Sequence, residues 1–295
     1  MILNTNNEVQ TYDKTHPKER GYRVVLSIAG SDSLGGAGIQ ADIKTFSALG
    51  IYGATAITAI TAQNTQGVDS QFAVPTQMVH DQIVAVMEDI HPSVIKIGML
   101  SNAEIAERVA DTLRLYNIPI ILDPVMVSTS GHRLLSNKAR DVIKQRLLPM
   151  TTLVTPNIPE MEALTDMSVT TYEQKRLAAE HLFGYGVKAI LLKGGHEAGD
   201  SKSDTLFIQT PKGIQSTLFT SNTIATRNTH GTGCTLSAAI AAYLATGLDL
   251  SMAIGKAKEY ITEAIKTGSD ISIGFGNGPV NHGFNPQKMH VYERE

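Results

Sequence analysis

The sequence predicts an α/β fold, with a mainly parallel central sheet flanked by helices on both faces and a short antiparallel hairpin. Strand-like apolar segments alternate with segments of helical periodicity from residue 22 to about residue 200, which is the pattern of a sheet covered on both faces. The chain has 295 residues, 42% of them hydrophobic, and no repeat, charged run or linker divides it. We therefore predict one domain over residues 21–295, preceded by a flexible polar extension over residues 1–20.

The expected elements follow in regular order. β-compatible apolar runs predict strands at Tyr22–Ala29, Tyr52–Ala62, Val94–Ile97, Ile118–Leu122, Leu153–Thr155 and Ala189–Leu192. Apolar spacing, N-caps such as Asn102 and a first-turn proline at Pro159 predict helices over residues 39–49, 76–90, 103–116, 137–147, 159–164, 172–183, 235–245 and 250–267. Asp204–Thr210 and Gly213–Phe219 flank Pro211-Lys212 and predict the hairpin.

Two loops have compositions that suggest contact with a ligand. The glycine-rich loop Gly30–Gly38 connects the first strand to the first helix, but no Lys-Ser or Lys-Thr pair follows it and its spacing is not that of a dinucleotide fingerprint. We interpret it as a place where a ligand approaches the backbone closely. The small polar residues of Val127–His132 are typical of a mobile flap.

Composition excludes several classes of partner and location. A net charge of −3 provides no basic footprint for nucleic acid, and no apolar run is long enough to cross a membrane. The single cysteine permits no intrachain disulfide, which suits a reducing cytoplasm. We expect a cytoplasmic protein that binds neither nucleic acid nor membrane.

The stretch from Gly231 to Cys234 is the strongest candidate for chemistry. Gly231-Thr232-Gly233 is a small-residue turn that leads into a helix, where unpaired N–H groups and the helix dipole favour an anion. Cys234 falls in the first helical turn, where this field lowers the pKa of a thiol. We therefore expect Cys234 to be partly thiolate and to accept a proton. The structural alternative is a glycine turn before a buried helix, with Cys234 as a core residue.

Polar residues also collect after the predicted strands, where ligands bind in such sheets. Asp123, Asn157 and Glu160 are oxygen donors suited to Mg²⁺, and Lys193 is a cation suited to a nucleotide phosphate. Each residue alone also has an ordinary structural explanation: a strand-end turn, a helix start or a solvated lysine. Their placement beside an anion site favours a common function.

Eight ordered motifs, spread over residues 29–280, resemble one family. They are Ala29–Asp32 with Gly35–Asp42, Thr61–Thr65, Lys96–Leu100, Asp123–Met126, Thr155–Glu160, Leu192–His196, Asn228–Cys234 and Gly278–Val280. The chain resembles the hydroxymethylpyrimidine/phosphomethylpyrimidine kinases of thiamine biosynthesis, within the ribokinase-like superfamily. The resemblance implies a ribokinase-like fold, and we expect a homodimer. It also implies ATP-dependent phosphorylation of 4-amino-5-hydroxymethyl-2-methylpyrimidine and then of its monophosphate, with Mg²⁺.

The resemblance also assigns roles to residues. It places five residues in the pyrimidine pocket: Gly30, Asp42, Gln63, Met99 and Val125. Asp42 and Gln63 would hydrogen-bond the ring. It implies ATP contacts from Asn157, Lys193 and His230, a metal held by Asp123 and Glu160, and a catalytic anion hole formed by Gly231, Thr232, Gly233 and Cys234.

Two features depart from common patterns. Most of the superfamily has Asp at the position of Cys234, whereas pyrimidine kinases have Cys. Many relatives have Lys at Thr129 and Asp at His132, which makes the second phosphorylation the less certain step. A pyridoxal kinase of the same fold is the nearest alternative. A vitamin-binding or regulatory protein on a lapsed kinase scaffold is a further one.

Overall fold

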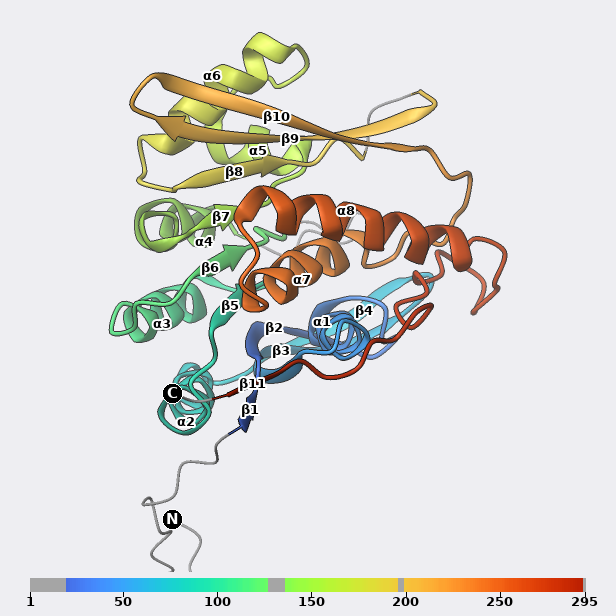
Figure 1. Ribbon diagram of the computed structural model, residues 1–295. Helices are drawn as coiled ribbons and strands as arrows, with labels where there is room; N and C mark the ends of the chain where they lie inside the picture. The colour runs from blue at the N-terminus through green and yellow to red at the C-terminus, as the bar shows by residue number, and fades with distance from the viewer. Residues whose placement is uncertain (1–19, 127–135, 196–198, 294–295) are drawn as a thin grey trace, which may run out of the picture.

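A nine-stranded sheet forms the centre of the molecule (Figure 1). The structure is a computed structural model that describes residues 20–126, 136–195 and 199–293. The expected N-terminal extension up to residue 19 and the expected flap at residues 127–132 lie outside these ranges. In spatial order the strands are β10 (Gly213–Asn222), β9 (Ser201–Thr210), β8 (Ala189–Leu192), β7 (Leu153–Val154), β6 (Ile120–Leu122), β5 (Val94–Ile97), β2 (Val24–Asp32), β3 (Tyr52–Asn64) and β4 (Gly67–Ala73).

The centre of this sheet is parallel and its two edges are antiparallel. Every neighbouring pair from β3 through β2, β5, β6 and β7 to β8 is parallel. The edges are closed by β4 on one side and by the β9–β10 hairpin on the other, both antiparallel. The fold class predicted from the sequence is therefore confirmed, including the hairpin. Because the central strands are parallel, their carboxyl ends meet at one edge of the sheet.

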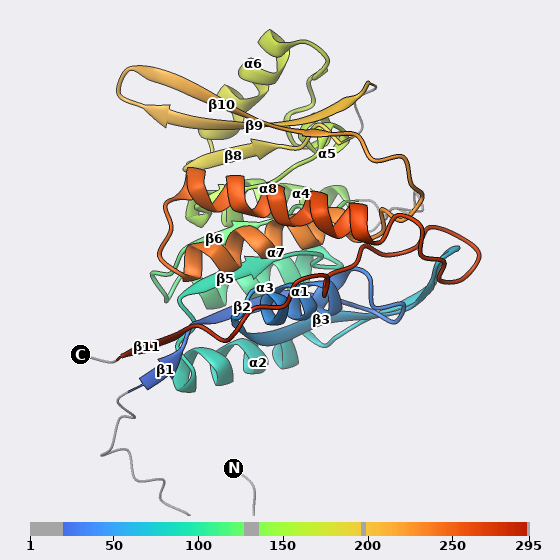
Figure 2. The ribbon, with the colours of Figure 1, turned by 45° about the vertical axis from the view of Figure 1, so that its right-hand side comes forward.

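Helices cover both faces of the sheet, as Figures 1 and 2 show. One face packs against α2 (Thr76–Asp89), α3 (Ala103–Leu113), α4 (Asn137–Val142), α5 (Ile158–Thr165) and α6 (Tyr172–Phe183). The other packs against α1 (Gly38–Ala48), α7 (Thr232–Ala245) and α8 (Leu250–Thr267). Within the described ranges, no helix has the length and apolar character that a membrane span requires.

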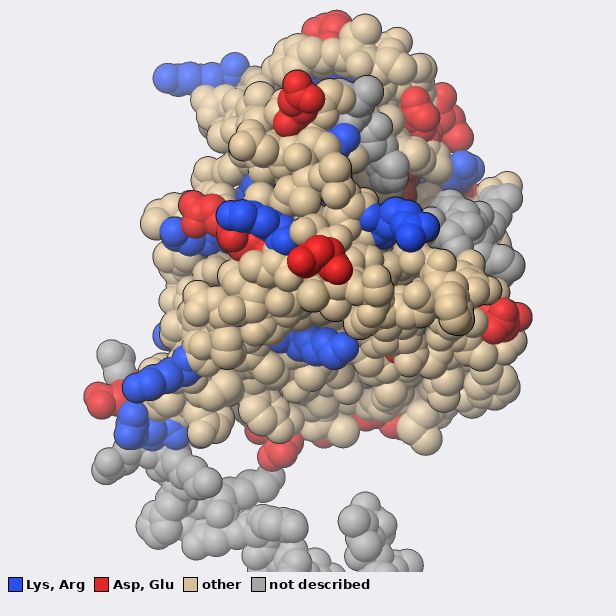
Figure 3. Space-filling view, turned by 90° about the vertical axis from the view of Figure 1, so that its right-hand side faces the viewer, with Lys and Arg blue, Asp and Glu red and all other residues tan. Residues whose placement is uncertain are grey.

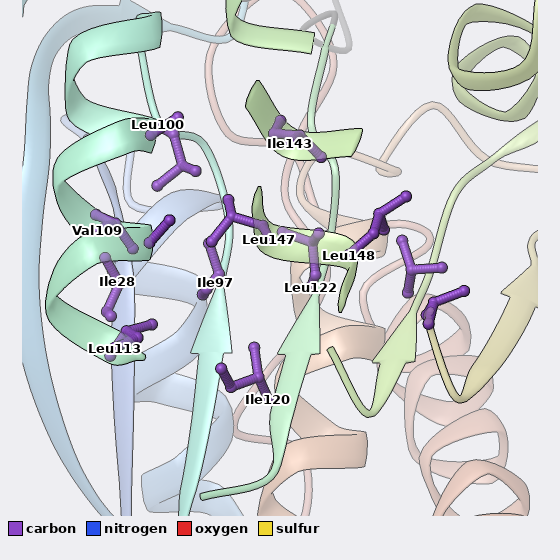
Figure 4. Close-up of a cluster of buried hydrophobic side chains, with 14 of the residues drawn as sticks. Ile28, Ile97, Leu100, Val109, Leu113, Ile120, Leu122, Ile143, Leu147 and Leu148 are labelled. Atoms are coloured by element: carbon purple, nitrogen blue, oxygen red, sulfur yellow. The ribbon is translucent and has the colours of Figure 1, made fainter. Parts of the chain in front are cut away.

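Two separate hydrophobic clusters hold these layers together. In the first, Ile97 and Leu122 project from neighbouring strands toward Leu113 and Leu147 on the covering helices (Figure 4). In the second, α7 lies between the sheet and α8 and is rich in buried alanines. The buried alanines of α7 allow its neighbours to approach it closely.

Several boundaries differ from the sequence prediction. β2 and β3 run further than expected, to Asp32 and Asn64, and the polar cluster after β3 is the turn of a hairpin with β4. β4 was not predicted, because its side chains are mostly exposed and its sequence does not alternate in polarity. The two-stranded sheet of β1 (Arg20–Tyr22) and β11 (Val291–Glu293) was missed for the same reason. The predicted helix over residues 137–147 changes to a π-helix after Val142 and is followed by a 3₁₀ turn over Leu148–Met150.

Candidate active site

A cavity of about 640 Å³ opens along the carboxyl ends of the parallel strands. We call one side of this cavity the substrate side; it includes Gly30, Gln63, Met99 and Val125. We call the other side the nucleotide side; it is lined by α8 and by the segments around β9 and β10. Its residues include Lys202, Asp204, Asn222, Thr223, Lys258, Thr262 and Ile265. The N-terminus of α7 lies between the two sides, because the cavity wall also includes residues 229–234.

The N-terminus of α7 presents bare backbone amides to this cavity. Gly231 is the N-cap residue with a φ of 78°, and no side chain caps the helix. The amide of Thr232 donates to the carbonyl of Thr229, whereas those of Gly233 and Cys234 make no hydrogen bond within the described residues. Two N–H groups and the helix dipole are therefore available to an anion. The helix starts at Thr232, three residues before the predicted start, so the predicted turn forms its cap and first turn.

The glycine loop after β2 contrasts with this arrangement. The amides of Gly36 and Ala37, at the N-terminus of α1, both donate to the carboxylate of Asp32, at 3.0 and 2.8 Å. A protein side chain therefore holds the amides of the turn that immediately precedes α1. This loop brings Gly30 to the substrate side of the cavity, and Ala37 and Gly38 at the start of α1 also line the cavity.

Asp123, Glu160 and Lys193 form a charged cluster beside the amides of α7. The Nζ atom of Lys193 lies 2.7 Å from Asp123 Oδ1 and 3.7 Å from Glu160 Oε2. A Cβ atom added at Gly233 would lie 3.3 Å from the same Nζ, so the ammonium is adjacent to the anion turn. Asn157 holds Glu160 in place through a capping box, in which each side chain accepts from the other residue's backbone N–H.

Burial and charge pairing shift these groups in different directions. Burial raises the pKa of Glu160 to about 7, against the opposing effect of Lys193 and with a further contribution from Asp123. Burial would also raise the pKa of Asp123, but Lys193 and Lys96 outweigh it and leave this pKa below its ordinary value. Burial opposes the charge of Lys193, yet Asp123 and Glu160 raise its pKa above the ordinary value. The cluster therefore contains a permanent cation, a permanent anion and a carboxyl group that titrates near neutral pH.

The donor set fits a nucleotide-bound Mg²⁺ better than a protein-only metal site. Within the described ranges, no group of three or more His, Cys, Asp or Glu side chains is placed to hold a metal ion. Asp123 and Glu160 supply two carboxylates, and Mg²⁺ is commonly held by one or two carboxylates together with substrate phosphates and water.

Asp42 does not line the cavity, which contradicts its predicted contact with the pyrimidine. Its carboxylate is completely buried, with both oxygens 2.9 Å from the Nζ of Lys96 and one 2.5 Å from the hydroxyl of Ser27. Lys96 lines the cavity in its place, and Asp42 raises the pKa of this ammonium, so that it stays charged. The carboxylate of Asp42 pairs with Lys96 instead of lining the cavity, because a buried cation needs a counter-ion.

The environment of Cys234 contradicts the prediction that its thiol has a lowered pKa and is partly ionised. The residue lines the cavity at the start of α7, but its pKa is raised to about 11. Burial is the largest cause, Lys96 opposes it, and the carboxylates of Asp123 and Asp42 add to it. The expected effect of the helix terminus is therefore outweighed by desolvation and nearby negative charge, and the thiol is protonated at neutral pH.

The ring of His230 is committed to a protein partner. Its Nε2 atom lies 2.8 Å from Asp32 Oδ2, and the residue is 5% exposed. It lines the cavity, but the predicted ATP contact would compete with this pairing. In the part of the chain that the structure describes, the side-chain amide of Gln63 makes two long contacts of 3.4 Å, to His230 and Thr61, so it is available to a ligand.

Sequence reasoning missed several cavity residues. Lys96 was hidden inside an apolar strand, and Asp32 was expected at the ligand edge of the sheet but was given no role of its own. Lys258 was read as an ordinary helix residue, yet its Nζ lies 2.7 Å from Asp204 Oδ2, and Asp204 also accepts from the backbone N–H of Gly194. Polar residues inside apolar segments were the available signal for Lys96 and Asp204.

This fold and this site define a class of protein. A doubly covered parallel sheet, with bare helix-terminal amides and a lysine between two sides of one cavity, is the arrangement of a small-molecule kinase of the ribokinase-like fold. The model of the family described as "Phosphomethylpyrimidine kinase" matches residues 32–281. The chain belongs to this family, and it is a kinase.

Individual relatives agree with this assignment. The chain is 46% identical to the hydroxymethylpyrimidine/phosphomethylpyrimidine kinase of Rhizobium meliloti over 260 residues, which cover 88% of this chain and 96% of that protein. It is 47% identical to a thiamine biosynthesis bifunctional protein of Geobacter sulfurreducens over 92% of its own length, and it spans 54% of that longer protein.

Solved structures point to two related kinases. A phosphomethylpyrimidine kinase from Clostridium difficile superposes with a TM-score of 0.72 at 42% identity, over 82% of this chain and 99% of that one. A pyridoxal kinase from Staphylococcus aureus, in complex with AMP-PCP and pyridoxal, superposes with a TM-score of 0.81 at 32% identity, over 93% of this chain and 100% of that one.

Proposed function

We propose that this kinase transfers the γ-phosphoryl group of ATP to the hydroxymethyl group of 4-amino-5-hydroxymethyl-2-methylpyrimidine, and then phosphorylates the resulting monophosphate. One observation carries the proposal: the bare amides of Gly233 and Cys234 lie with Lys193 where the two sides of the cavity meet. A phosphoryl group in transfer between a nucleotide and an alcohol would lie at this junction.

The substrate side is suited to a flat, partly polar ring. Gly30 and Met99 are in direct contact, since a Cβ atom at Gly30 would lie 2.3 Å from the Met99 methyl group, and together they form part of the cavity wall. The hydroxyl of Thr58 donates to the carbonyl of Met99 at 2.6 Å and fixes this wall. The free amide of Gln63 would hydrogen-bond the ring, which keeps its predicted role.

The chain's own groups then stabilise the transferring phosphate. Lys193 and the two amides of α7 would meet the negative charge that develops in transfer. Asp123 and Glu160 would hold Mg²⁺ beside them, and the ion would neutralise charge on the nucleotide phosphates. Asn157 holds Glu160 in this cluster through the capping box. Phosphoryl transfer of this kind is loose enough to need little early proton removal, so a protonated Cys234 is compatible with it.

The test is product analysis by mass spectrometry. The aminopyrimidine and excess ATP should give the monophosphate first and the diphosphate later, with one ADP for each phosphate transferred. An Asp123→Asn enzyme, prepared in parallel, controls for a contaminating kinase. Absence of any phosphorylated pyrimidine from the wild-type enzyme would overturn the proposal, and a reaction that stops at one phosphate would remove its second step.

A pyridoxal kinase is the second candidate, because the S. aureus pyridoxal kinase superposes over more of the chain than the C. difficile enzyme. Pyridoxal also carries a hydroxymethyl group on a flat heteroaromatic ring. The ratio of kcat/KM for the aminopyrimidine to that for pyridoxal, measured with one enzyme preparation, decides between them. A ratio above one favours the pyrimidine.

We also propose that the enzyme is a cytoplasmic homodimer that does not bind nucleic acid. The single cysteine is consistent with a reducing compartment. The edge strand β4 and its neighbour β3 carry exposed apolar side chains, Phe72 and Ile60, of the kind that a second copy would cover. On the face shown in Figure 3, charged side chains are scattered and form no broad basic patch. Light scattering of the purified enzyme, with Phe72→Glu as the variant, tests the dimer.

A further inference from the structure

Asp32 and His230 connect the two loops that hold the two reactants. Asp32 is the last residue of β2 and begins the glycine loop of the substrate side, whereas His230 immediately precedes the anion turn. The two residues are 198 positions apart in the chain, and their side chains meet at 2.8 Å in a buried contact. No other role described above uses this pair.

The Asp32 carboxylate organises the whole glycine loop. Its Oδ1 accepts from the N–H of Leu34 at 2.9 Å, and its Oδ2 accepts from the N–H groups of Gly36 and Ala37. Because Oδ2 also meets His230, one oxygen atom fixes both the glycine loop and the residue before the anion turn. The carboxylate is the acceptor, so His230 Nε2 carries the proton and donates it.

The two loops also touch through their backbones. A Cβ atom at Gly231 would lie 1.7 Å from the carbonyl oxygen of Gly36, and one at Gly36 would lie 2.6 Å from the His230 ring. Only glycines permit this approach. A second contact comes from the backbone, since the N–H of His230 donates to the carbonyl of Gly278 at 3.0 Å. The side chain of His230 is thus held by Asp32 and its backbone by Gly278, directly before the N-cap residue of α7.

We propose that the Asp32–His230 pair is a positioning element that sets the substrate side in register with the anion turn. Through it, the hydroxyl of the bound alcohol is kept in line with the phosphoryl group held by α7. Neither side chain acts as an acid or base in this role. The proposal rests on the kinase activity and holds for either candidate alcohol.

Such a role has a specific consequence for the reaction. A misplacement of about 1 Å can reduce a reaction rate about 100-fold while binding is retained. When the alcohol is out of line, water can reach the phosphoryl group instead. The loss should therefore appear in kcat rather than KM, and some ATP should be hydrolysed without a phosphorylated alcohol being formed.

The experiment compares three site variants with a remote histidine variant. His230→Leu removes the donor, His230→Gln restores a donor at the Nε2 position, and Asp32→Asn weakens the acceptor. His80→Gln is the matched control, because His80 also makes a histidine side-chain hydrogen bond, to Thr112 at 2.8 Å, but lies on α2 away from the cavity. For each, kcat, both KM values, the ratio of ADP to phosphorylated product, and the melting temperature are measured.

We expect His230→Leu to lower kcat at least tenfold, change each KM less than threefold, and raise the ADP-to-product ratio above one. His230→Gln should recover most of the coupling, and His80→Gln should match the wild type in kcat and coupling. A His230→Leu enzyme that melts like the wild type and keeps both its kcat and a ratio of one would overturn the proposal. Equal losses in His230→Leu and His230→Gln would overturn it as well.

The same experiment separates this inference from the proposed function. If the wild type phosphorylates pyridoxal but not the aminopyrimidine, the proposed substrate is wrong, and the coupling measurement proceeds with pyridoxal. If the wild type phosphorylates the aminopyrimidine and the variants remain coupled, the inference alone fails. If His230→Leu does not fold, Asp32→Asn decides the test by the same criteria, because it retains the size of the side chain and an acceptor for the loop amides.

Discussion

The protonation state of Cys234 can be tested directly, because it is the only cysteine in the chain. Its pKa of about 11 lies two units above the ordinary value of 9.0. Only the thiolate reacts with alkylating reagents, so at pH 7 about 1 in 10⁴ molecules would be reactive, against about 1 in 10² for an ordinary thiol. The structure therefore predicts about 100-fold slower alkylation than the ordinary pKa would give.

The assay is iodoacetamide modification followed by intact-mass spectrometry between pH 7 and pH 9. Partial burial slows access at every pH, so the slope carries the information and the absolute rate does not. The rate in the folded enzyme should rise about tenfold per pH unit throughout, a total of about 100-fold, with no plateau. The same chain unfolded in urea is the reference and should begin to level off near pH 9.

A flat rate between pH 7 and pH 9 would refute this reasoning. It would mean that Cys234 is already a thiolate and that the amides at the start of α7 outweigh burial. That outcome would restore the role predicted from the sequence, in which Cys234 takes the proton of the attacking hydroxyl. A steep rise with pH would instead leave the thiol as a neutral neighbour of the phosphoryl group.

Three further predictions follow from the site. Asp123→Asn removes the anion that pairs with Lys193. In steady-state kinetics kcat should therefore fall at least 100-fold, while KM for the alcohol changes less than about threefold. Equal changes in kcat and KM would contradict a role of Asp123 at the phosphates. Because the pKa of Glu160 is raised to about 7, its carboxylate forms as pH increases, and kcat/KM for ATP should rise through pH 7 in the wild type but not in Glu160→Gln. Asp42→Ala leaves a buried, unpaired Lys96, so the free energy of unfolding, measured in urea, should drop by about 3–5 kcal/mol. Replacing Asp42 with Leu and Lys96 with Met in one variant should lower it much less. A stable Asp42→Ala variant with weakened alcohol binding would return Asp42 to the substrate site.

The sequence was a good guide where the signal is local. The six predicted central strands and the hairpin are present, and α6, β8 and α8 have the predicted boundaries, because apolar periodicity and caps are properties of adjacent residues. Asn102 caps α3 through its side chain as expected. β4 could not be found in this way, because it is an exposed edge strand held by backbone pairing with β3.

The sequence predicted which charged residues of the candidate site lie together, but it did not predict their pKa values. Asp123, Glu160 and Lys193 do converge, since strand order brings the ends of β6, β7 and β8 together. Their environment could not be predicted from the sequence. The pKa of Cys234 depends on the depth of the pocket and on the charge of Lys96, and that residue is 138 positions away and inside an apolar strand.

The glycine-rich turns before α1 and α7 are similar in sequence but differ in the group that lies opposite their amides. Both α1 and α7 begin at a glycine-rich turn, and helix geometry gives each N-terminus the same unpaired amides and the same dipole. At α1 the Asp32 carboxylate accepts from the amides of Gly36 and of the N-cap residue Ala37, so a protein side chain fixes the turn that leads into the helix. At α7 no side chain of the described residues accepts from the first amides, and Lys193 lies beside them, so the turn stays open and electropositive. A glycine turn before a helix therefore indicates only that an anion fits there, and whether that anion belongs to the protein or to its substrate depends on which residues the fold places opposite it.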